Sequence, residues 1–82
     1  MRDKIYKVGN CPICRQGELE IVQEIHSGKL IICCDECDAE WISPDDALAS
    51  LKGSRNKFGK TQNATLQEII NLGWDKYLKS YK

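Results

Sequence analysis

Two C-x-x-C motifs constrain this chain more than any other feature. Cys11 and Cys14 form the first motif, and Cys34 and Cys37 form the second. Nineteen residues separate the two motifs. Two residues inside each motif let the chain wrap so that both sulfurs point at one ion at ~2.3 Å. Two such pairs have the spacing of a four-thiolate metal site. The sequence therefore predicts one structural zinc ion per chain, with no coordination position left open for water or a substrate.

The chain is short enough that its fold is expected to depend on the metal. With 82 residues the chain buries a small apolar core, so its stability is expected to depend on a staple. Structural zinc contributes roughly 10–16 kcal/mol in zinc-finger peptides. A disulfide framework fits poorly, because five cysteines leave one unpaired and the N-terminal residues contain no apolar signal-peptide core. No run approaches the ~20 apolar residues of a membrane span. We therefore expect a cytoplasmic protein with reduced thiols and no membrane partner.

Two alternatives concern the metal and its ligands. Iron is the weaker candidate metal. A rubredoxin-like iron site uses the same four ligands, but glycine usually follows the second cysteine of each motif. Arg15 and Asp38 stand at those positions here. Cys33 can replace Cys34 as a ligand, although three residues would then separate it from Cys37. We favour Cys33 as a small buried group over a reactive thiol, since acidic neighbours raise the pKa of a thiol.

A β-hairpin is predicted between the two motifs. Apolar and polar residues alternate over residues 18–26, as in a half-buried strand. Ser27 and Gly28 form the turn, and residues 29–33 form the returning strand. Residues 40–42 add a short third strand. His26, at the hairpin tip, is predicted to be a solvated residue and not a ligand.

Two short helices are predicted after the strands. Ser43 is a favourable N-cap with Pro44 at the first helical position, and Gly53 can end this helix. Residues 53–63 are polar, basic and glycine-bearing, which predicts a loop. Thr65 and Glu68 match a capping box that opens the second helix.

The predicted fold is a small metal-stapled α+β domain covering residues 1–82. It consists of a zinc ribbon over residues 8–43, with a β-hairpin and a short third strand. A segment over residues 44–82 carries the two short C-terminal helices, and Gly73 ends or kinks the second of them.

Charge is distributed unevenly, although the formal net charge is zero. Residues 10–52 contain nine acidic and three basic residues, whereas residues 53–82 contain six basic and two acidic ones. Four thiolates with one divalent zinc would make the ribbon more acidic, which counts against the ribbon itself as a nucleic-acid surface. An enzyme is the least supported class, because the chain has one histidine and no pairing of a nucleophile with a base. No small-molecule substrate is expected.

Several short motifs resemble a group of small bacterial zinc-ribbon proteins. The motifs are C-P-I-C at 11–14, R-Q-G-E-L at 15–19, C-D-E-C-D-A-E-W at 34–41, S-P-D-D-A at 43–47 and G-W-D at 73–75. The resemblance implies a bacterial zinc protein, and some similar proteins look like immunity or accessory proteins encoded beside toxin or secretion genes. This chain departs from the pattern by carrying Cys33 and by lacking a glycine after Cys14.

These observations favour a protein-interaction module. The chain offers an acidic face and aromatic residues of the kind that anchor interfaces, namely Trp41, Trp74, Tyr77 and Tyr81. The alternative for most of these aromatic residues is a place in the core. The alternative is a nucleic-acid-binding zinc ribbon that uses the basic segment 55–60, where an aromatic residue lies among cations. Its contact residues would be Arg55, Lys57, Phe58 and Lys60.

Overall fold

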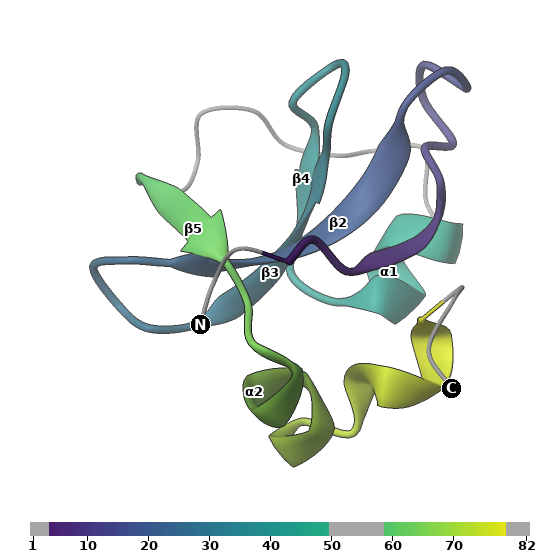
Figure 1. Cartoon of the computed structure of the whole chain (residues 1–82). Coiled ribbons are helices and arrows are strands. Elements are labelled where there is room, and N and C mark those ends of the chain that lie inside the picture. Colours follow the sequence, from purple (N-terminus) through teal and green to yellow (C-terminus); the bar gives the residue numbers. More distant parts are fainter. Residues whose placement is uncertain (1–3, 50–58, 79–82) are drawn as a thin grey trace.

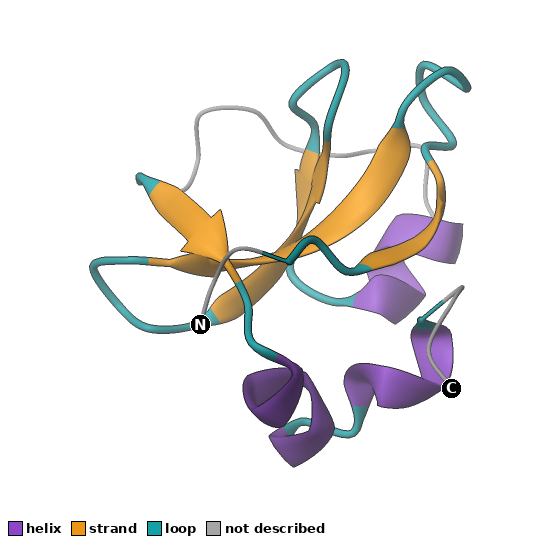
Figure 2. Ribbon diagram, in the orientation of Figure 1, coloured by secondary structure: helices purple, strands orange, loops and turns teal. Residues whose placement is uncertain are grey.

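The computed structural model describes residues 4–49 and 59–78, which form a small α+β protein with an antiparallel sheet and two short helices, as predicted (Figures 1 and 2). The strands are β1 (Lys7–Asn10), β2 (Glu18–Glu24), β3 (Leu30–Cys34), β4 (Glu40–Trp41) and β5 (Thr61–Asn63). The helices are α1 (Pro44–Ala49) and α2 (Leu66–Asn71), and a 3₁₀ turn, η1 (Trp74–Tyr77), follows α2. No helix among these described residues is long and apolar enough to cross a membrane.

The hairpin of β2 and β3 is the centre of the sheet, and its register pairs Leu19 with Cys34 and Ile21 with Ile32. Both strands differ slightly from the prediction. β2 ends at Glu24, two residues early, because the Glu24 carbonyl accepts a hydrogen bond from the Gly28 amide and closes the turn. β3 begins and ends one residue late, so Cys34 is itself a strand residue.

Two strands were not predicted, so the expected hairpin with a short third strand is in fact a five-stranded sheet. The strand order is β1-β2-β3-β4, and β5 also pairs with β2. β1 pairs along the first half of β2 and β5 along its second half. The prediction of a loop through residue 63 was therefore wrong for the three residues of β5. Hydrogen bonds made by the residues on either side of β5 hold it in place beside β2. One of them joins the Ile25 amide, just after β2, to the Lys60 carbonyl at 2.9 Å.

The helices lie on one face of the sheet and enclose the core with it (Figure 2). The core combines apolar residues from every strand except β5 with residues from both helices: Val8, Leu19, Ile21, Leu30, Ile32, Trp41, Ala47 and Ile69. Trp41, one of the aromatic residues considered either as an interface anchor or as core, is 3% exposed and belongs to the core. It pairs with Ile32, so both side chains lie on the same buried face of the sheet.

Both helix starts were predicted correctly. The Ser43 hydroxyl accepts a hydrogen bond from the Asp46 amide at 3.2 Å, and Pro44 is the first helical residue of α1. The helix is described to Ala49, so its predicted end at Gly53 lies outside the described residues. In α2 the capping box of Thr65 and Glu68 is complete. Gly73 follows α2 with a φ of 75°, a left-handed conformation that favours glycine.

Candidate metal centre

The four cysteines of the two motifs lie at one end of the sheet. Cys11 and Cys14 belong to the loop between β1 and β2, whereas Cys34 ends β3 and Cys37 lies in the loop leading to β4. These two loops stand at the same end of the sheet (Figure 1). The four sulfur atoms all lie within 4.8 Å of one another, so this group can hold a metal ion.

The sulfur–sulfur distances fit tetrahedral coordination. Cys11 Sγ lies 3.7 Å from Cys37 Sγ, and Cys14 Sγ lies 3.6 Å from Cys34 Sγ. A tetrahedron with metal–sulfur bonds of about 2.3 Å has sulfur–sulfur edges of about 3.8 Å. A disulfide requires sulfurs about 2.05 Å apart, so these are free thiols. Two of the close pairs join one motif to the other, and a shared ion would therefore fasten the two loops together.

Backbone amides point at the sulfurs within each loop. Cys11 Sγ accepts from the Ile13 amide at 3.4 Å, and Cys14 Sγ accepts from the Gly17 amide at 3.4 Å. The second loop repeats the arrangement, because Cys34 Sγ accepts from the amides of Glu36 at 3.3 Å and Cys37 at 3.4 Å. Such donors favour the thiolate form that binds metals.

The residue that follows each motif adopts the left-handed backbone conformation that the tight turn requires. Arg15 has a φ of 59° and Asp38 a φ of 62°. Both loops thus adopt the backbone turn that glycine usually provides, at a cost of roughly 1–2 kcal/mol for a residue with a side chain. The residue type at these two positions therefore does not distinguish zinc from iron. The donor set of four thiolates suits both metals.

Gly17 is a position of the site that the sequence indicated only as part of the R-Q-G-E-L motif. A methyl group there would lie 2.7 Å from Cys34 Sγ, 2.7 Å from an Asp35 carboxylate oxygen and 2.8 Å from Glu36 Cβ. The glycine thus allows the loop that carries Cys14 to approach the loop that carries Cys34. The sequence signal was available, because the glycine lies three residues after the second cysteine of the first motif.

A polar clamp on the sheet surface fixes the second loop to β2. The Asp35 carboxylate accepts from the Glu18 amide at 2.8 Å, and the Asp35 amide donates to the Glu18 carbonyl at 3.1 Å. Lys7 forms ion pairs with both carboxylates, at 2.9 Å to Glu18 and 3.5 Å to Asp35. The hydrogen bond to Glu18 raises the pKa of Lys7. The clamp was not predicted, since it joins residues distant in sequence.

Without a metal, two of the thiols titrate very differently. Hydrogen bonds from the amides of Gln16 and Gly17 lower the pKa of Cys14 to about 6. Burial raises the pKa of Cys34 to about 12, although two amides donate to its sulfur. A divalent cation among the sulfurs would favour the thiolate form of each, so metal binding displaces protons from this cluster.

Neither Cys33 nor His26 belongs to the cluster. Cys33 is half-buried, and its Sγ donates to the Cys34 carbonyl at 3.5 Å. Burial raises the pKa of Cys33 to about 11, and Glu40 and Asp38 add to that shift. His26 is exposed in the hairpin turn.

The other predicted contact residues are only partly described. Arg55, Lys57 and Phe58 lie outside the described residues, as does Tyr81, while Lys60 is exposed. Trp74 and Tyr77 are half-buried against the core. The Tyr77 hydroxyl donates a hydrogen bond to the Asp45 carboxylate, which joins η1 to α1 and raises the pKa of Tyr77.

Comparisons of the chain with protein-family models, with curated proteins and with solved structures found no match.

Proposed function

We propose that this chain is a non-enzymatic, cytoplasmic zinc-ribbon protein of bacterial type whose role is to bind another protein. The cluster of four thiols carries the proposal, since its sulfurs are spaced for one tetrahedral ion. Four protein ligands fill a tetrahedron, which leaves no position for water or a substrate and makes the metal structural. We propose zinc as the metal, with iron as the alternative that uses the same four thiolates. The motifs shared with small zinc-ribbon proteins support the same assignment.

The loops that the metal would join hold the sheet together at one end. Such a staple would stabilise a small domain and fix the surface that it presents. Large apolar side chains are exposed on this small protein, including Ile25, Ile42 and Leu72. Exposed apolar side chains of this size are common at protein interfaces.

The test begins with metal content. Elemental analysis of the protein purified without added metal is expected to find one zinc per chain, with iron as a minor component. A metal-free chain that unfolds cooperatively would refute the structural-metal role. Co-purification from the native cell, followed by mass spectrometry, is expected to recover a protein partner. Loss of that partner from a Cys34→Ser variant would tie the interaction to the metal-stapled fold.

Nucleic-acid binding is the competing outcome. We expect affinity for random DNA or RNA at physiological salt no better than the ~10⁻⁴–10⁻⁶ M of generic electrostatic binding. Sub-micromolar binding that weakens in an Arg55→Gln, Lys57→Gln, Lys60→Gln triple variant would support the alternative instead. A Phe58→Ala variant should then lose about 1–3 kcal/mol on single strands through lost stacking.

A further inference from the structure

The first half of β3 has a free edge. β4 pairs with β3 only at Ile32 and Cys33, so within residues 4–49 and 59–78 no strand lies beside Leu30 on that side. The register would place Ser43 opposite Leu30. Ser43 is instead the N-cap of α1, and its carbonyl accepts from the Ala47 amide at 3.1 Å. The start of the helix thus ends β4, and no other described segment pairs with the edge of β3 at Leu30.

The backbone groups of Leu30 point at this free edge. Along an antiparallel strand, the N–H and C=O of successive residues point alternately to opposite sides. The Cys34 amide donates to the Ala39 carbonyl at 2.9 Å, on the β4 side, while the Lys29 carbonyl accepts from Glu24 at 2.8 Å, on the β2 side. Leu30 is four residues before Cys34 and therefore faces the β4 side. Among the described residues, its N–H and C=O have no hydrogen-bond partner.

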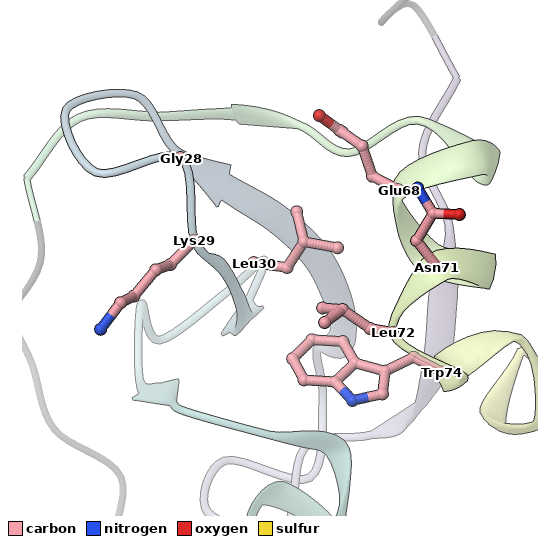
Figure 3. Close-up of a pocket in the computed structure, with 7 residues that line it drawn as sticks. All are labelled: Gly28, Lys29, Leu30, Glu68, Asn71, Leu72 and Trp74. Carbon is pink, nitrogen blue, oxygen red and sulfur yellow. The ribbon is translucent and has the colours of Figure 1, made fainter.

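An apolar groove of about 480 Å³ lies beside the same residue. Its walls are the hairpin turn with the start of β3 on one side, and the end of α2 with η1 on the other. The side chains of Leu30, Leu72 and Trp74 converge in the groove, whereas Lys29 points away from it (Figure 3). Leu72 is 52% exposed, so the apolar wall is open to solvent.

We propose that this edge and groove bind an extended segment of a protein partner. One partner residue would pair with Leu30 through its backbone N–H and C=O, adding a short strand to the sheet. In a directly opposed pair both side chains lie on the same face of the sheet. The partner's side chain would therefore enter the groove between Leu30, Leu72 and Trp74, and a large apolar residue fits it.

A polypeptide is the occupant that the observations favour. The N–H and C=O of Leu30, which have no partner among the described residues, would be satisfied by a peptide backbone. An apolar small molecule would cover them and leave them without partners. This inference rests on the proposed function, because it names the surface through which the interaction module would bind.

The probe is a decapeptide selected from a random phage-displayed library on the zinc-loaded full chain, with its affinity measured by calorimetry. Leu72→Ser is expected to weaken binding of this peptide at least tenfold. Leu48→Ser is the matched control, since Leu48 is similarly exposed at 49% but lies on α1 against Gly9. The control is expected to bind the peptide within twofold of the parent chain.

The backbone pairing has its own readouts. N-methylation of the peptide, one position at a time, is expected to weaken binding at least tenfold at the residue opposite Leu30. Hydrogen exchange of the Leu30 amide, followed by NMR, is expected to slow at least tenfold in the complex. If Leu72→Ser loses binding but no N-methylation of the peptide weakens it, the groove is a simple apolar pocket. That result would overturn the strand pairing.

Three further outcomes would overturn the proposal. They are failure to select any peptide, selection of peptides that bind Leu72→Ser normally, and self-association of the chain that Leu72→Ser abolishes in sedimentation equilibrium. The last would make a second copy the occupant. A native partner that still binds Leu72→Ser would refute this surface and leave the proposed function standing. A metal-free, folded chain that still binds the peptide would refute the structural-metal role in the proposed function and leave this surface standing.

Discussion

At the scale of single residues, Gly17 is the position most sensitive to a small change. Gly17→Ala places a methyl group 2.7 Å from Cys34 Sγ, a contact that forces the two cysteine loops apart. We expect it to destabilise the zinc-loaded protein by about 1–3 kcal/mol, the usual cost of overpacking, and to weaken zinc binding. Urea unfolding and competition with a chelator measure the two effects. Gly59→Ala is the control, because among the described residues its methyl group would meet just the Glu24 carboxylate, at 3.8 Å. Equal losses in both variants would contradict the steric account.

Cys33 and Cys34 are neighbours in sequence with opposite expected roles. Cys34 Sγ lies in the cluster, whereas Cys33 Sγ bonds only to a carbonyl among the described residues. Cys34→Ser is expected to abolish stoichiometric zinc and unfold the ribbon. Cys33→Ser is expected to keep one zinc and to cost at most about 1–2 kcal/mol. Elemental analysis with urea unfolding separates the two, and the reverse result would make Cys33 the ligand.

At the scale of elements, α2 depends on its N-terminal cap. The Thr65 hydroxyl accepts from the Glu68 amide at 3.3 Å, and the Glu68 carboxylate accepts from the Thr65 amide at 2.9 Å. Thr65→Ala is expected to cost about 1 kcal/mol, since it leaves a helix amide without a partner. Gln67→Ala, on the exposed side of the same helix, should stay within about 0.5 kcal/mol. Equal free energies of unfolding for the two variants would show that the cap contributes nothing.

Local signals made some elements predictable. The alternating residues of β2, the serine and proline before α1 and the capping box of α2 each act within a few residues, so the sequence alone indicated these elements. The cysteine motifs were equally local, and the structure brings their four sulfurs together.

Strands held by distant partners were not predictable. β5 reads Thr61-Gln62-Asn63, with no apolar residue and no alternation. It is a strand because β2 offers it backbone partners, and because the Glu24 carboxylate accepts from the Gly59 amide at 2.8 Å just before it. The same long-range pairing explains why Val22 is buried, because it lies opposite Asn63. The sequence left both core and interface open for Trp41 for a similar reason, since its burial depends on pairing with Ile32.

At the scale of the whole molecule, β3 connects the two sites. Cys34 at its end belongs to the thiol cluster, and Leu30 at its start borders the groove. Leu30 and Cys34 are four positions apart along the strand, about 13 Å, so the metal would not contact a partner side chain bound in the groove. Its effect on binding would act through the rigidity of the hairpin that carries both.

Zinc loading of the whole molecule is expected to depend on pH. In the metal-free protein at pH 7.5, Cys34 is a neutral thiol because burial raises its pKa to about 12, while amide hydrogen bonds hold the pKa of Cys14 near 6. Zinc must displace the proton of Cys34, so binding releases at least one proton. Protons compete with zinc for the thiolates, because each cysteine must be deprotonated to bind the metal. The stability that zinc contributes is therefore present at neutral pH and lost on acidification.

We expect zinc affinity to rise at least tenfold per pH unit between about pH 6.5 and 8.5, one decade for each proton released. Competition with a chromophoric chelator measures the affinity, and calorimetry at pH 7.5 in two buffers of different ionisation enthalpy counts the protons directly. Cys33→Ser is the control: burial already raises the pKa of Cys33 to about 11, so this thiol is neutral with or without zinc. The variant should keep the same slope. A pH-independent affinity would mean that the four thiols are ionised before the metal binds. That result would contradict the expectation that the buried Cys34 is a neutral thiol. A shallower slope in Cys33→Ser would instead place the Cys33 sulfur on the metal.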